Sequence, residues 1–312
     1  MGQNILITGG AGYLGSIAAA RFLEAGHSVT VLDNLMYGQH SLFHLCADQR
    51  FQFVFGDARD ERVLAPLVRE ADMILPLACI VGASACDRDP VAARSINVDA
   101  VRLLIRLRTS RQRVVYPTTN SGYGTKTGAT FCTEETPLDP ISLYGETKVE
   151  AERLLLAEPN TIAFRLATVF GMSPRMRLDL LVNHFTLAAV TDRYLVIFEK
   201  DFKRNYVHIR DVADAFLYAF EHGDAMVGRP YNLGLDDANL SKAELAETIR
   251  RQVPDFFIHY AEVGSDPDKR DYIVSNQRLK EAGFEATRGL EAGIRELIKG
   301  YRMLGLGAMK NA

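Results

Sequence analysis

The stretch Ile5-Leu-Ile-Thr-Gly9-Gly-Ala-Gly12-Tyr-Leu-Gly15 joins a short apolar run to a glycine-rich turn and a segment with a helical pattern. A strand, a glycine-rich turn and a helix in this order form a dinucleotide-binding site. Gly9 permits a tight turn, Gly12 lets the backbone approach a pyrophosphate, and Gly15 lets the helix pack closely on the strand. The helix N-terminus then offers free N–H groups and a partial positive charge to the phosphates.

Asp33 ends a second apolar run that starts at His27. It lies about 20 residues beyond the glycines, where an acid can accept hydrogen bonds from the adenosine ribose of NAD. The 2′-phosphate of NADP would be repelled by this carboxylate, and no Arg or Lys occurs from Asn34 to His44 to attract it. The sequence therefore predicts NAD as the cofactor.

The composition is that of an ordinary globular protein. The chain has 312 residues, 47% of them hydrophobic and 24% charged, with a net charge of −3. This length allows one large or two modest domains with a real core. The charge gives no reason to expect binding to nucleic acid or to a membrane surface.

The cysteines and the apolar runs predict a cytoplasmic protein without a metal. Cys46, Cys79, Cys86 and Cys132 form no CxxC pair and show no spacing typical of metal ligands. The first strand begins almost at the N-terminus, which leaves no room for a signal peptide. No apolar run reaches the roughly 18 residues that a membrane span requires.

Strands and helices alternate through the first half of the chain. The sequence predicts strands at 5–8, 28–32, 51–55, 73–76 and 113–116, with helices at 16–25, 63–68 and 98–108. This alternation indicates an α/β fold, a Rossmann-type doubly wound parallel sheet whose ligands bind beyond the carboxyl ends of the strands. After Phe170 the alternation weakens, and isolated helices are expected at 242–251 and 290–297. We expect an NAD-binding domain over 1–170 with 205–231, and a smaller α/β substrate-binding lobe over 171–204 with 232–312.

Tyr144 and Lys148 are the candidate catalytic pair. They are four residues apart in Tyr144-Gly-Glu-Thr-Lys148, so on a helix they share one face. A phenol with a pKa near 10 is a poor base at neutral pH, but a neighbouring ammonium and an oxidised nicotinamide would stabilise the phenolate. Such a pair suits removal of a proton from a hydroxyl while hydride leaves its carbon. Lys148 could also hold the nicotinamide ribose.

The ordered motifs resemble the extended short-chain dehydrogenase/reductase family, the sugar-nucleotide epimerases, dehydratases and reductases. They are GGAGYLG, Asp33, Gly56-Asp57, Leu77-Ala78, Asn97, TTNSGYG, YGETK, FRLATVFG and NYVHIRDVADA, which together span nearly the whole chain. The resemblance implies that Tyr144 is the general base, Lys148 its partner and Thr119 the active-site hydroxyl. It implies that Asp57 contacts adenine, that Leu77 and Ala78 line the cofactor, and that Asn97 supports the active-site helix. The cofactor-binding residues expected on both grounds are Gly9, Gly12, Tyr13, Leu14, Gly15, Asp33, Asn34, Asp57, Ala58, Leu77, Ala78, Asn97, Tyr144 and Lys148.

Departures from the family narrow the predicted reaction. The related 4,6-dehydratases carry Asp-Glu or Ser-Glu directly after the active-site Thr, and these side chains eliminate water. This chain has Asn120 and Ser121 there, which are not effective acids or bases near neutral pH, so we expect no dehydratase activity. Thr168 stands where many relatives have a substrate-binding Asn. The substrate-binding residues expected are Asn120, Ser121, Thr168, Arg175, Arg177, Arg204 and Arg270, with Arg204 and Arg270 matching family diphosphate positions.

TTNSGYG, CTEETPLDPISLYG, RLATVFGMSPRMRLDLLVN and DPDKRDYIVSN also resemble a bacterial branch that includes GDP-heptose 4-dehydrogenases of capsule biosynthesis. We therefore expect an NAD-dependent oxidoreductase acting at C4 of a nucleotide-linked hexose or heptose. A 4-epimerase uses the same residues, so the motifs do not separate the two. An NAD-binding regulator without catalysis is the alternative from another class, and the intact Tyr144, Lys148 and Thr119 speak against it. The family resemblance also implies a homodimer built from helices near 98–109 and 144–157.

Overall fold

A seven-stranded parallel sheet is the largest element of the computed structural model, which describes residues 2–126, 131–264 and 270–304. Every pairing between its neighbouring strands is parallel. From one edge to the other its strands are β10 (Pro230–Leu233), β6 (Thr161–Leu166), β5 (Arg113–Thr119), β4 (Met73–Pro76), β1 (Asn4–Thr8), β2 (Ser28–Asp33) and β3 (Phe51–Phe55). The order reverses beside β1, so a crevice opens where β1 and β4 end.

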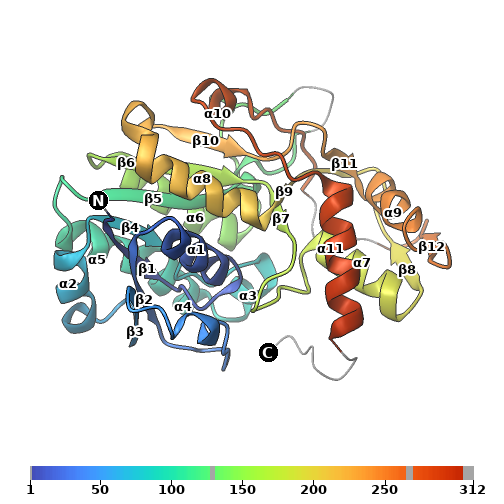
Figure 1. The fold of residues 1–312 in the computed structure, drawn as a ribbon. Coiled ribbons are helices and arrows are strands. Elements are labelled where there is room, and N and C mark those ends of the chain that lie inside the picture. The colour runs from blue at the N-terminus through green and yellow to red at the C-terminus, as the bar shows by residue number, and fades with distance from the viewer. Residues whose placement is uncertain (1, 127–130, 265–269, 305–312) are drawn as a thin grey trace.

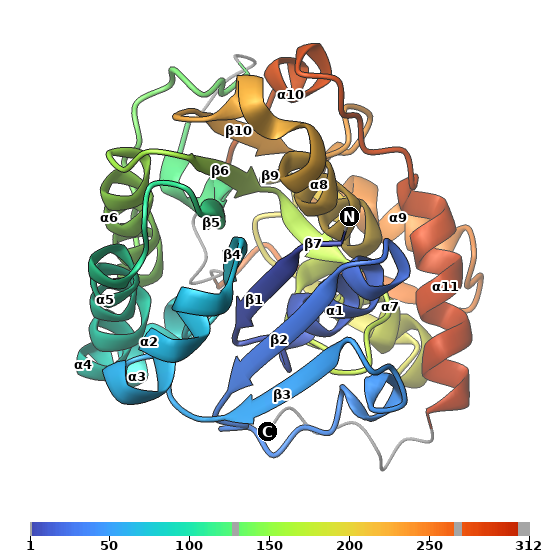
Figure 2. The same ribbon diagram turned by 60° about the vertical axis from the view of Figure 1, so that its left-hand side comes forward.

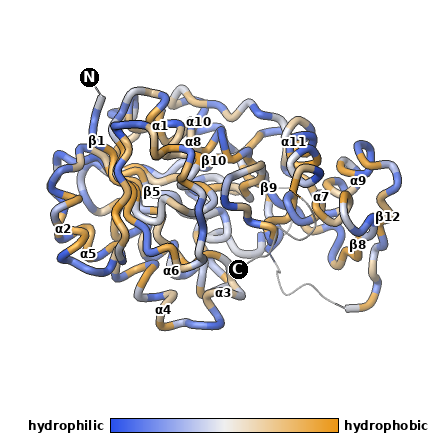
Figure 3. Tube along the Cα trace, turned by 60° about the horizontal axis from the view of Figure 1, so that its bottom comes forward, coloured by the Kyte–Doolittle hydropathy of each residue, from blue (hydrophilic) through white to orange (hydrophobic). Residues whose placement is uncertain are grey.

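Helices cover both faces of this sheet, as Figure 2 shows. One face carries α1 (Tyr13–Glu24) and α8 (Ile209–His222), and the other carries α2 (Glu61–Glu70), α5 (Ala100–Leu107) and α6 (Leu143–Leu156). Successive residues of β1 point to opposite faces: Ile5 and Ile7 join the core under α1 and α8, whereas Leu6 joins the core under α2, α5 and α6. β1 is therefore apolar on both sides, which explains its unbroken apolar run in the sequence. Figure 3 shows hydrophobic residues along the chain in this part of the molecule.

A second group of elements gathers at the carboxyl ends of the strands (Figure 1). It contains a three-stranded sheet of β7 (Thr168–Phe170), β9 (Lys203–His208) and β11 (Asn239–Ser241), and a two-stranded parallel sheet of β8 (Tyr194–Ile197) and β12 (Phe257–Tyr260). Its helices α7 (Leu181–Thr191), α9 (Lys242–Arg250) and α11 (Leu290–Met303) share one hydrophobic core. Short helices complete the chain: α3 (Ala83–Arg88), α4 (Pro90–Arg94), a π-helical turn (Ser95–Asp99) and α10 (Gln277–Glu281), with 3₁₀ turns at 43–45, 120–123 and 223–226.

The predicted Rossmann-type fold is confirmed, and the expected strands lie within two residues of the observed ones except that β5 extends three residues further, to Thr119. The expected helix at 98–108 is observed as α5 with a π-helical turn before it, and the expected helix at 290–297 continues to Met303. The proposed domain boundaries stay a prediction. Within the segment 205–231, α8 and β10 pack on the large sheet, whereas most of β9 pairs with β7 and β11.

Candidate active site

A cavity of about 1380 Å³ lies between the large sheet and the second group of elements, at the carboxyl ends of the strands. The described residues that line it include nearly all of the predicted site: Gly9, Gly12, Tyr13, Leu14, Gly15, Asp33, Asn34, Asp57, Ala58, Leu77, Ala78, Thr119, Ser121, Tyr144, Lys148, Thr168, Arg175, Arg177, Arg204 and Arg270. Asn97 and Asn120 are the two predicted site residues outside this lining. The fold thus brings together side chains separated by up to about 260 positions in the sequence.

The glycine-rich turn packs too closely for any larger residue. Gly9 has a φ of +73°, and a Cβ there would lie 2.5 Å from the backbone nitrogen of Ala78. A Cβ on Gly15 would lie 2.6 Å from the Cα of Gly10, so this glycine lets α1 approach the turn. Gly12 is the N-cap of α1, with no acidic residue in the first turn. The first amides of a helix have no intrahelical partner, so this end of α1 is suited to a pyrophosphate.

Asp33 lies at the end of β2 with its carboxylate already oriented. Its Oδ2 accepts a hydrogen bond from the backbone N–H of Ala11 (2.9 Å), and its Oδ1 accepts one from that of Leu35 (2.8 Å). Burial raises the pKa of this carboxyl, while the two backbone hydrogen bonds lower it. The carboxylate joins the glycine turn to the loop after β2, which is where a ribose of NAD would be held.

The structure places Asp57 in the lining of the cavity and Asn97 outside it. Asp57 lines the cavity and is paired with Arg59, whose Nη2 lies 2.6 Å from Oδ2. Asn97 is buried; its side chain exchanges two hydrogen bonds with the backbone of Ile80 and donates one to Thr147 Oγ1 (3.1 Å). Asn97 therefore ties the loop after β4 to helix α6, and acts on the cavity through those two elements.

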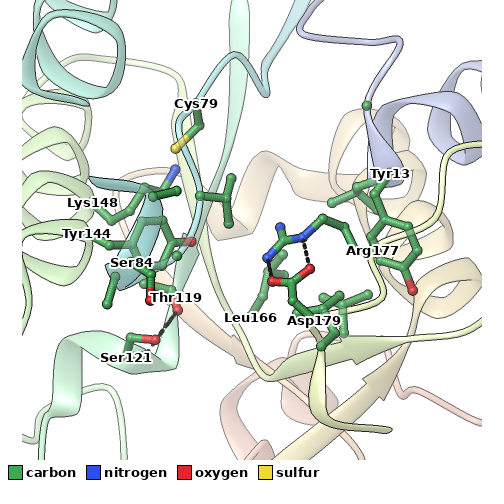
Figure 4. Close-up of a pocket in the computed structure, with 18 of the residues that line it drawn as sticks. Tyr13, Cys79, Ser84, Thr119, Ser121, Tyr144, Lys148, Leu166, Arg177 and Asp179 are labelled. Carbon is green, nitrogen blue, oxygen red and sulfur yellow. Dashed lines mark hydrogen bonds and ion pairs between the residues drawn. The ribbon is translucent and has the colours of Figure 1, made fainter. Parts of the chain in front are cut away.

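Helix α6 positions the candidate catalytic pair, Tyr144 and Lys148 (Figure 4). The Oγ of Ser142 caps the helix by accepting a hydrogen bond from the N–H of Gly145 (3.2 Å), so Tyr144 stands in the first turn. Lys148 follows one turn later and is buried, with its Nζ 4.1 Å from the centroid of the Tyr116 ring. Tyr116 is the middle residue of β5, so its aromatic face holds the ammonium against that strand.

The pKa shifts of Tyr144 and Lys148 differ in part from what the sequence predicts. Burial raises the pKa of the Tyr144 phenol, while the charges of Arg177 and Arg270 act to lower it. Burial also lowers the pKa of Lys148. In the protein alone the phenol is thus held protonated, and a positive charge brought by the ligand is needed to favour the phenolate.

Thr119 completes the reacting face. It is the last residue of β5, and its Oγ1 donates to Ser121 Oγ at 2.9 Å and accepts from the N–H of Ser121 at 3.1 Å. The guanidinium of Arg270 also donates to Ser121 Oγ. Asn120 lies outside the lining: it is 1% exposed, and neither atom of its side-chain amide has a protein hydrogen-bond partner. Of the two positions after Thr119 that carry acids in the dehydratases, only that of Ser121 therefore lines the cavity.

The opposite wall carries basic side chains. The guanidinium carbon of Arg204 lies 5.5 Å from the centroid of the Tyr272 ring. Arg175 and Arg177 come from the loop between β7 and α7, where Arg177 forms two hydrogen bonds with Asp179. Thr168, at the start of β7, lines the cavity between the two walls.

Sequence reasoning missed several lining residues, among them Tyr37, Cys79, Ser84, Asp179, His184 and Lys242. Cys79 directly follows the predicted Leu77-Ala78 pair, and Asp179 is two residues beyond Arg177, so proximity to predicted positions was an available signal for both. Nothing in the local sequence of His184 or Lys242 marks them, because their place depends on how α7 and α9 pack.

No cluster of three His, Cys, Asp or Glu side chains suited to a metal occurs within the described ranges. Among the same residues, no helix combines the length and the apolar character that crossing a bilayer requires.

Comparison with known proteins agrees with this geometry. The sequence model of the NAD dependent epimerase/dehydratase family matches residues 5–234. The UDP-glucose 4-epimerase of Mycolicibacterium smegmatis is 30% identical over 95% of this chain and 98% of its own length. The low-salt glycan biosynthesis protein Agl12 of Haloferax volcanii is 27% identical over 96% and 98%.

Solved structures share the fold at lower identity. The dTDP-glucose 4,6-dehydratase of Bacillus anthracis, in complex with NAD, superposes with a TM-score of 0.84 at 23% identity, covering 97% of each chain. The UDP-glucose 4-epimerase of Thermotoga maritima, with UDP-glucose, gives a TM-score of 0.82 at 23% identity, covering 96% of this chain and 99% of the other.

Proposed function

The chain belongs to the NAD-dependent epimerase/dehydratase family and is an enzyme with NAD as its cofactor, and on that premise we propose that it oxidises, or reversibly reduces, C4 of a nucleotide-linked hexose or heptose. One observation carries the proposal: Tyr144, Lys148 and Thr119 line the cavity beside the glycine turn, while the position of a dehydratase acid holds a buried Asn120. The relative from M. smegmatis is named for a reaction at C4, which supports that carbon as the reacting one.

The glycine turn and Asp33 would hold NAD, which when bound would supply the acceptor for the hydride of the sugar carbon. Tyr144 takes the proton of the 4-hydroxyl group, and Lys148 favours the phenolate and holds a ribose hydroxyl. Thr119 orients the reacting oxygen by donating a hydrogen bond to it, in place of the one that the Thr119 hydroxyl donates to Ser121 Oγ. Arg270 also donates to Ser121 Oγ. Arg204 and Arg270, on the opposite wall, bind the diphosphate of the nucleotide sugar.

A Tyr144→Phe substitution tests this assignment. The phenylalanine fills the same volume but cannot accept a proton, so turnover should fall by more than about 1000-fold, the upper part of the range for a general base. Absorbance of reduced nicotinamide is followed after mixing protein and NAD with a panel of GDP-, UDP-, CDP- and dTDP-sugars. NAD affinity, measured by titration, should stay within about twofold of the parent value. Undiminished turnover in the variant would refute the role of Tyr144.

A 4-epimerase is the second candidate, since it uses the same residues and returns the hydride to the other face of C4. It would show no net rise in reduced nicotinamide but would convert one sugar epimer into the other. NAD binding without turnover of any nucleotide sugar in the panel, by either route, would favour a regulator.

The remaining parts of the proposal concern the substrate, the biosynthetic role, the cellular compartment and the oligomeric state. The GDP-heptose branch suggests a GDP-sugar substrate and a role in capsule or polysaccharide biosynthesis. Four cysteines without a disulfide fit the cytoplasm. We also propose a homodimer through α5 and α6, whose outward sides carry the paired charges of Arg102 and Glu150; sedimentation of the purified protein tests this.

A further inference from the structure

The loop between β7 and α7, residues 171–180, is fastened to the first turn of α1. The hydroxyl of Tyr13 donates to the carbonyl of Gly171 at 2.8 Å. Ser173 Oγ donates to the carbonyl of Tyr13 at 2.7 Å and lies 3.0 Å from Ser16 Oγ. The loop therefore crosses the helix end that the glycine turn prepares for a pyrophosphate.

Arg177 extends from this loop across the cavity. Its Nε and Nη2 donate to Asp179 at 2.7 and 2.5 Å, which holds the guanidinium plane in one orientation. A Cβ built on Gly82 would lie 4.0 Å from its Nη2, so the guanidinium reaches the loop after β4 on the other wall. Its charge acts to lower the pKa of both Tyr13 and Tyr144. Arg177 thus stands between the end of α1 and the catalytic tyrosine (Figure 4).

Arg175 extends from the same loop towards the loop that follows β2. Its guanidinium carbon is 4.8 Å from the centroid of the Tyr37 ring, and Tyr37 follows Asp33 in the loop after β2. Burial lowers the pKa of Arg175, and the like charge of Arg177 lowers it further. The two guanidinium groups therefore lie close enough to influence each other, and Asp179, which is hydrogen-bonded to Arg177, offsets only one of their two charges. This part of the cavity is left with a net positive charge.

The glycine turn and the strand ends beside it lack such a charge. From Gly9 to Ala85 the lining residues include no Lys or Arg, so on this part of the wall the glycine turn offers backbone amides and a helix dipole. A dinucleotide pyrophosphate carries two negative charges. Guanidinium groups bind phosphate oxygens in paired hydrogen bonds and are the side chains best suited to balance those charges.

We infer that Arg175 and Arg177 hold the pyrophosphate of NAD, and not the diphosphate of the nucleotide sugar for which sequence patterns select them. Arg175 binds on the adenosine side and Arg177 on the nicotinamide side, with the phosphates enclosed between the end of α1 and the loop 171–180. The sugar diphosphate is left to Arg204 and Arg270. The inference requires NAD binding alone, so it stands or falls separately from the proposed reaction at C4.

Binding of three probes tests the assignment without turnover: NAD, ADP-ribose and adenosine, each titrated by calorimetry. In Arg175→Gln and in Arg177→Gln the Kd of NAD and of ADP-ribose should rise about tenfold, the effect of losing one charge-assisted hydrogen bond. The Kd of adenosine, which has no phosphate, should stay within about twofold. Arg193→Gln is the matched control, because it removes the same charge from an exposed pair with Asp255 and should change none of the three.

Removing Arg177 leaves Asp179 without its partner, so folding is checked by thermal unfolding of each variant. Arg177→Gln combined with Asp179→Asn restores neutrality, and Arg177→Lys keeps the charge but loses the paired geometry; both should still weaken ADP-ribose binding. Unchanged affinity for NAD and ADP-ribose in all four variants would overturn the inference. Weaker binding of UDP or GDP, with unchanged affinity for ADP-ribose, would instead assign both arginines to the diphosphate of the nucleotide sugar.

Discussion

The two walls of the cavity recognise their ligands by different means. On the Rossmann wall, between Gly9 and Ala85, the lining offers glycines, backbone amides and the carboxylates of Asp33 and Asp57. On the lobe wall the lining carries the long cationic side chains of Arg175, Arg177, Arg204, Lys242 and Arg270. The first wall is built from turns at the ends of neighbouring strands, and the second from side chains delivered by separate loops and helices.

This difference explains how each wall can change. A backbone cradle depends on conformation and close approach, so it tolerates few substitutions and keeps one ligand. A wall of side chains can be altered one residue at a time without disturbing the fold, which suits a family whose members act on different nucleotide sugars. We therefore expect the largest effects of mutation on the Rossmann wall.

Gly9→Ala should have the largest effect. The new Cβ would lie 2.5 Å from the nitrogen of Ala78 at a φ of +73°, and we expect the free energy of unfolding to fall by more than about 2 kcal/mol and NAD affinity by more than about 100-fold. Gly228→Ala is the control, since its φ of +80° imposes similar strain but nothing lies within 4 Å of the added Cβ. Urea unfolding and NAD titration measure both. If Gly9→Ala bound NAD with the affinity of the parent protein, NAD binding would not depend on the close packing of the glycine turn.

Asp33→Asn should have an intermediate effect. The amide keeps the size of the side chain but loses the negative charge and one of the two acceptors that bind the N–H groups of Ala11 and Leu35. NAD affinity should fall about tenfold and the preference for NAD over NADP should narrow, because repulsion of the 2′-phosphate is lost. Affinities for both dinucleotides, compared with those of an exposed Asp237→Asn control, decide this. An unchanged preference would show that another residue excludes NADP.

Glu296→Gln tests the attachment of the lobe wall and should have the smallest effect. Burial raises the pKa of Glu296, but hydrogen bonds from His208 and Arg210 outweigh it and lower the pKa from 4.5 to about 2. Glu296 also accepts from the N–H of Met172, which holds the start of the loop 171–180. A lowered pKa means that the ionised group stabilises the fold above pH 4.5 and that this contribution is lost as pH falls towards 2.

At neutral pH the Glu296→Gln variant should therefore be less stable by about 1 kcal/mol, a value reduced for partial exposure. The difference from the parent should shrink as pH falls from 4.5 towards 2. Urea unfolding at several pH values measures it, with Glu285→Gln as the control from an exposed pair with Lys280. A difference that stays constant with pH would assign the effect to packing.

The Rossmann wall was open to prediction because its signals are local. A glycine turn and a strand-end acid each lie within a few residues of sequence, and the strand positions follow from continuous apolar runs. The Tyr144–Lys148 pair, outside this wall, is predictable for the same reason, because its spacing is local. The lobe wall gives no such pattern. Asp179 orients Arg177, and Arg204 faces Tyr272 from 68 positions away, which only the packing of β9 and the segment after β12 brings about.

Two further features escaped prediction for physical reasons. The π-helical turn at 95–99 presents Asn97 to Ile80 and Thr147, and the helical pattern of the sequence does not reveal a local change of hydrogen-bond period. Asn120 stands in a polar loop and was expected at the substrate, but the 3₁₀ turn that begins there buries it.

The central claim is that this cavity removes hydride from C4 of a nucleotide sugar between a backbone cradle and a wall of arginines. The most direct measurement follows deuterium from C4 of the nucleotide sugar that turns over in the panel. Net oxidation at C4 should leave the deuterium on the nicotinamide. Epimerisation should return it to C4 of the epimerised product, with none lost to water. Deuterium kept at C4 with its original configuration, while the product has lost water or carries a change at another carbon alone, would contradict the central claim.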